Sequence, residues 1–196
     1  MKYVRYEYDG GVGHGILNGS DIQVTDAAMT AQGKPTGETL PASSVKLLAP
    51  VTPRTVVAIG LNYVDHAKES GMEVPDEPFL FLKTPGTIIS PGEEIKLVEP
   101  DHRNDYEAEL VIVIGKEARG VAAADALDYV LGYTCGNDVS DRNLQKSDDQ
   151  WVRAKACDTY GPLGPVVTDE IDPHNVQVQT RLNGAVKQNS NTNQMI

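Results

Sequence analysis

Two glutamates, Glu107 and Glu109, stand at the beginning of the most apolar stretch of the chain, residues 108–114. This stretch is apolar or β-branched at nearly every position and stops at a glycine, so we predict a buried β-strand. Side chains alternate along a strand, which places both carboxylates on one face, about 6.5 Å apart at the backbone. One cation between them would be within reach of both. The alternative is an acidic strand end in solvent, because buried carboxylates repel one another and are costly to desolvate.

A third acid would complete such a cation site, and Asp138 is the candidate. It follows a short predicted strand that ends in Asn137-Asp138, and side chains at the ends of strands often contribute to binding sites. However, an Asn-Asp pair before a polar helix is also the usual arrangement for a turn or a helix cap. The residues by themselves leave both interpretations open.

A second candidate group is an imidazole and a carboxylate on one helix. Residues 61–71 are predicted to form a two-turn helix that ends at a glycine, and His66 and Glu69 are three positions apart on it, therefore on one face. A carboxylate beside an imidazole raises its basicity and fixes its orientation, which is how a general base is usually built. An exposed surface pair is the alternative.

Lys155 and Thr159 lie in a stretch punctuated by glycine and proline, residues 153–165, which we predict to be a long, stiff loop. Loops of this length in compact domains are often functional. A lysine there could also simply be exposed to solvent, as lysine side chains usually are.

Composition limits the classes of function. The 196 residues are 40% hydrophobic and 23% charged, which suits one domain with a small appendage. The net charge of -11 argues against nucleic acid or an anionic membrane as a partner. Only two cysteines occur, far apart in the sequence, and no run approaches the length of a membrane span or a signal core. We therefore expect a reduced, cytoplasmic protein.

The order of turns and apolar runs predicts two units. Residues 1–50 are expected to form a small β domain, with a hairpin at Asn18-Gly19 and a turn-rich junction near residue 50. Residues 51–196 are expected to form the second domain, with short apolar strands at 55–60 and 79–82, and helical spacing at 121–130. A last hairpin is expected at Asn183-Gly184.

Five segments, in this order, resemble the fumarylacetoacetate hydrolase superfamily over residues 54–196. They are Gly60-Leu61-Asn62-Tyr63-x-x-His66-x-x-Glu69, Asp105-Tyr106-Glu107-Ala108-Glu109-Leu110, Gly136-Asn137-Asp138-Val139-Ser140-x-Arg142-x-x-Gln145, Arg153-Ala154-Lys155-x-x-Asp158-Thr159-x-Gly161-Pro162-x-Gly164-Pro165 and Leu182-Asn183-Gly184-x-x-x-Gln188. The first fifty residues resemble the small β domain that many bacterial and archaeal members carry.

The resemblance implies an α+β, mainly β fold: a mixed β-sheet roll of the fumarylacetoacetate hydrolase type with a small N-terminal β domain, usually in a homodimer. It also implies a cofactor, because in the family three carboxylates hold one Mg²⁺ or Mn²⁺. The matching residues here are Glu107, Glu109 and Asp138. Hard carboxylate oxygens agree with that choice of ion and leave open positions for substrate and water.

The remaining roles also come from the resemblance. His66 and Glu69 match the family's general-base pair, on a segment that closes over the metal. Lys155 matches the lysine that faces the substrate. Substrate contacts or bracing of the pocket are implied for three more positions: Arg142, Gln145 and Thr159.

We expect from this an enzyme that acts on 2-oxo or 2-enol carboxylic acids of aromatic catabolism through an enolate stabilised by the metal. It would hydrolyse acylpyruvates or isomerise 2-hydroxyhepta-2,4-diene-1,7-dioate. An oxaloacetate-type decarboxylase or tautomerase is the alternative. The family's roll continues beyond the last residue here, so we also expect the C-terminal part of the catalytic domain to be missing. A truncated, non-catalytic dimer that binds metal or small acids is therefore a further alternative.

Overall fold

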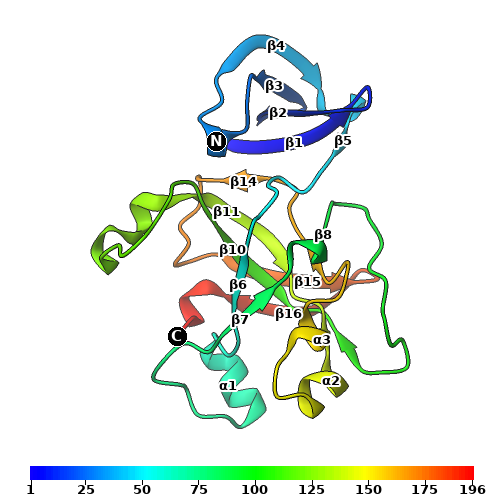
Figure 1. Cartoon of the computed structure of the whole chain (residues 1–196), viewed down its shortest axis with the longest axis vertical. Coiled ribbons are helices and arrows are strands. Elements are labelled where there is room, and N and C mark those ends of the chain that lie inside the picture. The colour runs from blue at the N-terminus through cyan, green and yellow to red at the C-terminus, as the bar shows by residue number, and fades with distance from the viewer.

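The computed structural model describes residues 1–196. Its first part is an antiparallel unit of five strands, seen at the top of Figure 1. The predicted hairpin at Asn18-Gly19 is confirmed, because Leu17 pairs with Ile22 and Asn18 with Asp21 around a glycine at φ +62°. The strands are β1 (Lys2–Tyr8), β2 (Gly11–Asn18), β3 (Asp21–Thr25), β4 (Pro35–Pro41) and β5 (Lys46–Leu47).

The larger part is built from short strands and few helices. Its strands are β6 (Val56–Ile59), β7 (Leu80–Lys83), β8 (Ile88–Ile89), β9 (Asn104–Asp105), β10 (Ala108–Ile114), β11 (Val130–Asn137), β12 (Ser140–Asp141), β13 (Gly161–Pro162), β14 (Val167–Thr168), β15 (Gln177–Leu182) and β16 (Ala185–Asn191). Its α-helices are α1 (Val64–Ser70), α2 (Arg142–Ser147) and α3 (Val152–Lys155). The chain also has five 3₁₀ helices: Met29–Ala31, Ala42–Ser44, Pro85–Thr87, Ala123–Tyr129 and Thr192–Gln194.

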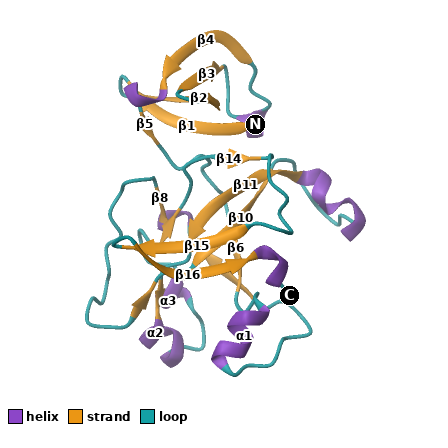
Figure 2. Cartoon of the chain, turned by 180° about the vertical axis from the view of Figure 1, so that it is seen from behind, coloured by secondary structure: helices purple, strands orange, loops and turns teal.

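Strand pairing makes the fold mainly β and mixed, as predicted. Most pairs are antiparallel, among them β10 with β11, β6 with β7 and β15 with β16, whereas β8 and β13 are parallel. Figure 2 shows the hairpin of β15 and β16 crossing the body beside β10. None of the helices has the length and apolar composition needed to cross a lipid bilayer.

One sheet connects the two parts. Its strand order is β10-β11-β14-β1-β2-β3-β4, and β5 also pairs with β1 outside this path. The link is β14, which pairs with β1 through Tyr3 and Val167 and with β11 through Tyr133 and Thr168. The units predicted for residues 1–50 and 51–196 are therefore joined by main-chain hydrogen bonds as well as by the chain itself.

Alternation along β1 divides the core between the two parts. Tyr3 points to one face, where it is buried with Ile16, Val113 and Val167 between the units. Its neighbour Val4 points to the other face, into a cluster inside the N-terminal unit. Burial of each such side chain contributes about 1.5–3 kcal/mol, so the first cluster holds the small unit against the larger part.

Three strands, β6, β7 and β10, are less buried than their apolar sequences predict. The strand predicted at 55–60 forms as β6, yet Val57 is 58% exposed, and Leu82, its partner on β7, is 60% exposed. In β10, Val113 is 8% exposed while Ile112 is 52% exposed. A continuous apolar run indicates two faces that can be buried. In this chain only one face of these strands is covered.

The helices differ from the expectation mainly at their beginnings. The helix predicted for 61–71 starts later, as α1, and ends as predicted at Gly71, which adopts φ +64°. The helical spacing at 121–130 belongs to the 3₁₀ helix Ala123–Tyr129. The predicted loop 153–165 begins inside α3.

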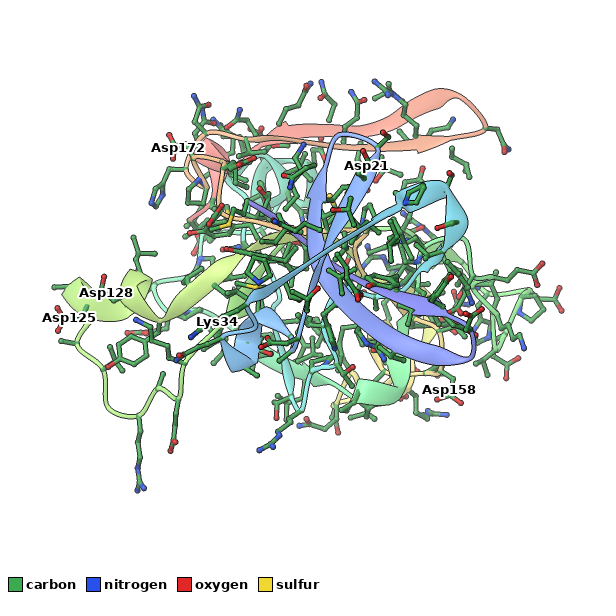
Figure 3. The ribbon with its side chains drawn as sticks, turned by 90° about the horizontal axis from the view of Figure 1, so that it is seen from above. Asp21, Lys34, Asp125, Asp128, Asp158 and Asp172 are labelled. Carbon is green, nitrogen blue, oxygen red and sulfur yellow. The ribbon has the colours of Figure 1, made fainter.

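Much of the acidic excess lies on the outside of the molecule. Figure 3 shows Asp125 and Asp128 on the projecting 3₁₀ helix and Asp21, Asp158 and Asp172 at other points of the periphery. All five are exposed. The net charge therefore does not describe the site below, where acids and bases are interleaved.

Candidate active site

The three predicted acids are brought together by the register of two neighbouring strands. Glu107 and Glu109 flank the first residue of β10, and Asp138 follows the last residue of β11. Glu109 pairs with Gly136, and the Asp138 N–H donates to the main-chain oxygen of Glu107 at 2.9 Å. The side-chain oxygen of Asn137 also accepts from the Glu107 N–H at 2.9 Å. The two strand ends are thus fixed side by side.

Asp138 does not cap the following helix. The carboxylate of Asp141 does so, accepting from the N–H groups of Asn143 at 2.9 Å and Leu144 at 3.0 Å. The helix-capping alternative for Asp138 is therefore wrong. Its carboxylate is free to take part in the acid cluster.

Lysine side chains lie between these acids. The Lys155 Nζ donates to Glu107 Oε2 at 2.6 Å and to Asp138 Oδ2 at 2.8 Å. Lys155 is 3% exposed, so the solvent-exposed alternative for this lysine is wrong. Lys83, from the end of β7, donates to Asp138 Oδ1 at 2.6 Å and to the main-chain oxygen of Lys155. Buried charges are stable only in such paired arrangements.

Arg142 holds the other side of Glu107. Its Nη2 forms an ion pair with Glu107 Oε1, and its Nε donates to Asp105 Oδ2 at 2.8 Å. Its Nη1 donates to Gln145 Oε1 at 2.7 Å. Arg142 and Gln145, predicted to line or brace the pocket, therefore contact each other, and Arg142 contacts an acid of the cluster directly.

The two glutamates have opposite electrostatic environments. Burial favours the neutral form of Glu107, but Lys155 and Arg142 outweigh it and lower the pKa of this carboxyl to about 2. Burial, and then the charges of Glu107 and Asp138, raise the pKa of Glu109 to about 8. The Glu109 carboxyl has no hydrogen bond or ion pair in the structure, and the charges of Lys155 and Lys83 offset the rise of its pKa only in part.

A cavity of about 650 Å³ opens beside this cluster. Helix α1 and the hairpin of β15 and β16 form its other walls. Its ionisable and amide lining includes His66, Glu69, Arg103, Glu107, Glu109, Arg142, Lys187 and Gln188.

The structure brings His66 and Glu69 to the cavity but not to each other. Both side chains are exposed, and no hydrogen bond joins them. Their action as a general-base pair stays a prediction.

Thr159 is placed differently from the other predicted residues. It adopts φ +71°, and its hydroxyl accepts from the N–H of Lys96 at 2.8 Å, outside the cavity lining. This hydrogen bond therefore connects the loop that contains Thr159 to the segment around Lys96. The predicted substrate contact of Thr159 stays untested.

Three residues of the site were not predicted as participants. The sequence did contain an indication for Lys83, because a lysine at the end of an apolar strand needs an acidic partner or solvent for its charge. Asp105 stands two residues before Glu107 and orients Arg142. The side-chain oxygen of Gln188 accepts from the Ala108 N–H at 2.9 Å, which ties the hairpin to the first residue of β10.

The donor set fits a divalent cation, although the side chains are not arranged around one. No group of three or more histidine, cysteine, aspartate or glutamate side chains is placed to hold a metal, and Lys155 lies between Glu107 and Asp138. Carboxylate oxygens, which these three acids on neighbouring strand ends supply, are the ligands that a hard Mg²⁺ or Mn²⁺ ion prefers. The buried Glu109 carboxyl, which has no hydrogen-bond or ion-pair partner and a raised pKa, is the observation that favours an added cation here, because a cation would stabilise its ionised form.

Family comparisons agree with this architecture. Residues 55–196 match the model described as fumarylacetoacetate (FAA) hydrolase C-terminal, and residues 1–50 match Rv2993c-like, N-terminal. An uncharacterised protein of Archaeoglobus fulgidus is 48% identical over 82% of this chain and 64% of its own length. The mitochondrial oxaloacetate tautomerase fahd2 of Xenopus laevis is 46% identical over 79% of this chain and 50% of its own length. The chain thus spans about half to two thirds of these relatives.

Solved structures are similar over the whole chain. The 2-hydroxyhepta-2,4-diene-1,7-dioate isomerase of Mycobacterium marinum is 37% identical with a TM-score of 0.90, covering 100% of this chain and 76% of that one. Maleylpyruvate hydrolase of Sphingobium sp. SYK-6, in complex with manganese(II) and pyruvate, is 26% identical with a TM-score of 0.76, covering 100% and 78%. By its sequence match and its fold, the chain belongs to the fumarylacetoacetate hydrolase family.

Proposed function

We propose that this chain is an enzyme acting on small 2-oxo or 2-enol carboxylic acids through an enolate of the substrate. The observation that carries the proposal is the cluster at the strand ends, where Glu107, Glu109 and Asp138 converge with buried lysines beside a 650 Å³ cavity. Perturbed carboxylates in a cavity that also contains an imidazole are typical of enzyme sites. Family membership agrees with an enzyme.

The three acids would hold the metal. A Mg²⁺ or Mn²⁺ ion on Glu107, Glu109 and Asp138 would act as a Lewis acid and stabilise negative charge on substrate oxygens. Arg142 keeps Glu107 ionised and oriented whether or not substrate is present, because it contacts Glu107 and Asp105 together. A manganese ion is present in the similar structure of maleylpyruvate hydrolase, which supports this choice of cofactor.

Lys155 provides a positive charge at the point where negative charge would develop. Its Nζ lies within 2.8 Å of carboxylate oxygens of Glu107 and Asp138, the oxygens that would bind the metal. Once Glu107 and Asp138 have another cationic partner, this ammonium group can donate a hydrogen bond to an anionic substrate oxygen. Such charge-assisted bonds are about twice as strong as neutral ones.

His66 is the candidate for proton transfer. It lies on the wall of the cavity opposite the acids, with Glu69 one turn of helix away. In a hydrolase it would remove a proton from the attacking water. In an isomerase it would move a proton between carbon atoms of the substrate. Both roles need only an imidazole in reach of the substrate.

Two reactions fit the site, and a third has its own support. Hydrolysis of a carbon–carbon bond in acylpyruvates would release the enolate of pyruvate, and isomerisation of 2-hydroxyhepta-2,4-diene-1,7-dioate would pass through the dienolate of that acid. Both reactions thus need stabilisation of the same type of anion, and a similar structure is an isomerase of that dioate. Oxaloacetate tautomerisation is the alternative, supported by 46% identity to the fahd2 tautomerase. A role in aromatic catabolism, a homodimer and a cytoplasmic location are part of this proposal.

A substrate panel tests the proposal. The protein is incubated with an acylpyruvate, the heptadienedioate and oxaloacetate, each with Mn²⁺ and with chelator, and the ultraviolet absorbance of the enol is followed. We expect metal-dependent conversion of at least one acid, lost in Glu109→Ala and retained in Glu94→Ala, which changes an exposed glutamate. Tight Mn²⁺ binding without conversion of any acid would contradict the proposed enzyme and indicate a metal-binding protein.

A further inference from the structure

A second cavity, of about 350 Å³, lies between the N-terminal unit and the catalytic body. Strands β1 and β2 form one wall, and Leu131 and Val167 of the body contribute to the other. The lining is mainly apolar. Two of its side chains are basic: Arg5 and His14.

These basic groups are direct neighbours. Arg5 on β1 and His14 on β2 are paired in the register, next to the pair of Tyr3 and Ile16 on the same face. That face packs against the apolar cluster between the two units. A guanidinium and an imidazole opposite each other beside an apolar cluster are unfavourable without an acceptor, because both lose solvent and the guanidinium repels the protonated form of the ring.

The structure provides no anion for Arg5. Arg5 is half-buried, forms no ion pair, and makes one side-chain hydrogen bond, to the main-chain oxygen of Ala49 at 3.3 Å. A guanidinium has five N–H donors, so most of them have no protein acceptor. Glu7, on the same face of β1, is exposed and forms no ion pair with Arg5.

His14 adds a second donor without a second full charge. Burial, and then the charge of Arg5, lower the pKa of this imidazole below its ordinary value. The neutral ring still offers one N–H. Arg5 and His14 together can thus receive one bidentate acceptor, which is the geometry of a carboxylate.

We infer that this cavity binds a small carboxylic acid with an apolar body, with the carboxylate on Arg5 and the body against Tyr3, Met29 and Leu131. A volume of 350 Å³ is within the range of about 300–1,000 Å³ usual for small-molecule sites. The site is separate from the catalytic cavity, with which it shares no lining residue. The inference therefore does not depend on the proposed function.

Benzoate, with benzamide as its neutral isostere, is a suitable probe. The chain has four histidines, and their ring C2 proton resonances can be followed by NMR in the intact protein. His14 reports on this cavity and His66 on the catalytic one. We expect benzoate to shift the His14 resonance saturably and benzamide to leave it unchanged. Benzoate that shifts only His66, or benzamide as effective as benzoate, would overturn the inference.

Variants separate the guanidinium from charge in general. Arg5→Met keeps the length of the side chain and should weaken benzoate binding at His14 by about tenfold or more, as expected for a lost charge-assisted pair. Arg5→Lys should retain part of the affinity. Arg54→Met, at an exposed arginine, should bind as the wild type does. Arg5→Met binding within twofold of wild type, in protein that still unfolds cooperatively, would contradict the assignment.

Discussion

Two sides of the candidate active site are built in different ways. One side, which we call the acid wall, consists of Lys83, Glu107, Glu109, Asp138 and Lys155. Charged hydrogen bonds join residues at or next to the ends of β7, β10, β11 and α3 there, and both lysines are almost fully buried. The facing wall is α1, a helix of seven residues in which only Ala67 is buried. Helices shorter than about 12–15 residues are marginal without tertiary packing. The proposed metal-binding groups are thus preorganised, while the residues predicted to transfer protons lie on the element that is easiest to move.

Removing the shared lysine should have the largest effect, because it breaks the acid wall. In Lys155→Met, Glu107 and Asp138 lose their common cation, and breaking a buried ion pair costs about 3–5 kcal/mol. We expect a metal-free protein less stable by about that amount in urea unfolding. Added Mn²⁺ should restore most of the loss, since the ion supplies the missing charge.

The same variant should also lose roughly ten- to a hundredfold in kcat/KM with Mn²⁺ present, because one charge-assisted contact is gone. Lys34→Met, at an exposed lysine, serves as the control in both assays. A Lys155→Met protein as stable as this control would show that the buried bridge contributes nothing.

Changing the facing wall should affect rate and leave stability unchanged. His66→Ala removes an exposed imidazole, so we expect unfolding within about 0.5 kcal/mol of wild type. Turnover on the best substrate should fall by about a hundredfold, at the low end for loss of a general base. Mn²⁺ affinity should not change. Undiminished turnover would move proton transfer to another group.

The smallest expected effect is a change of the free energy of unfolding with pH, which tests the environment of Glu109 in the acid wall. The folded protein raises the pKa of Glu109 to about 8, so it binds this proton more tightly than the unfolded chain does. The resulting stability is complete below the ordinary pKa of 4.5 and is lost as the pH rises through 8. Glu109→Gln has no such proton to lose.

The measurement is urea unfolding of both proteins with chelator at pH 5, 6.5 and 8. Wild type should lose at least about 1 kcal/mol relative to Glu109→Gln across this range. Parallel stability curves would mean that Glu109 is not in an unfavourable environment without metal.

Local sequence predicted the pieces of this site better than their contacts. Alternation along residues 108–114 put Glu107 and Glu109 on one side of a strand, and β10 forms over those residues. Nothing local to Lys83 indicated Asp138, because that contact joins residues 55 positions apart and depends on how β7 lies beside α3. The resemblance named Lys155 as a site residue, but its bridge between two acids needed the register of β10 and β11.

The exposure of β6 and β7 could not be predicted from the sequence either. The apolar runs at β6 and β7 predicted strands correctly. Because such a run has apolar side chains on both faces, it does not indicate which face the rest of the chain will cover. The contact between Arg5 and His14 across β1 and β2 was missed for a similar reason, since neither residue belongs to a recognisable pattern.

The central claim is that the acid wall is a cation site, and isothermal titration of Mn²⁺ tests it most directly. We expect one ion per chain for wild type and for the exposed-site control Glu94→Ala. In Glu109→Ala, loss of one of three carboxylate ligands should weaken binding by at least about a hundredfold. Equal affinity in Glu109→Ala and wild type would show that the acid wall does not bind the ion through Glu109, the one acid without a hydrogen-bond or ion-pair partner.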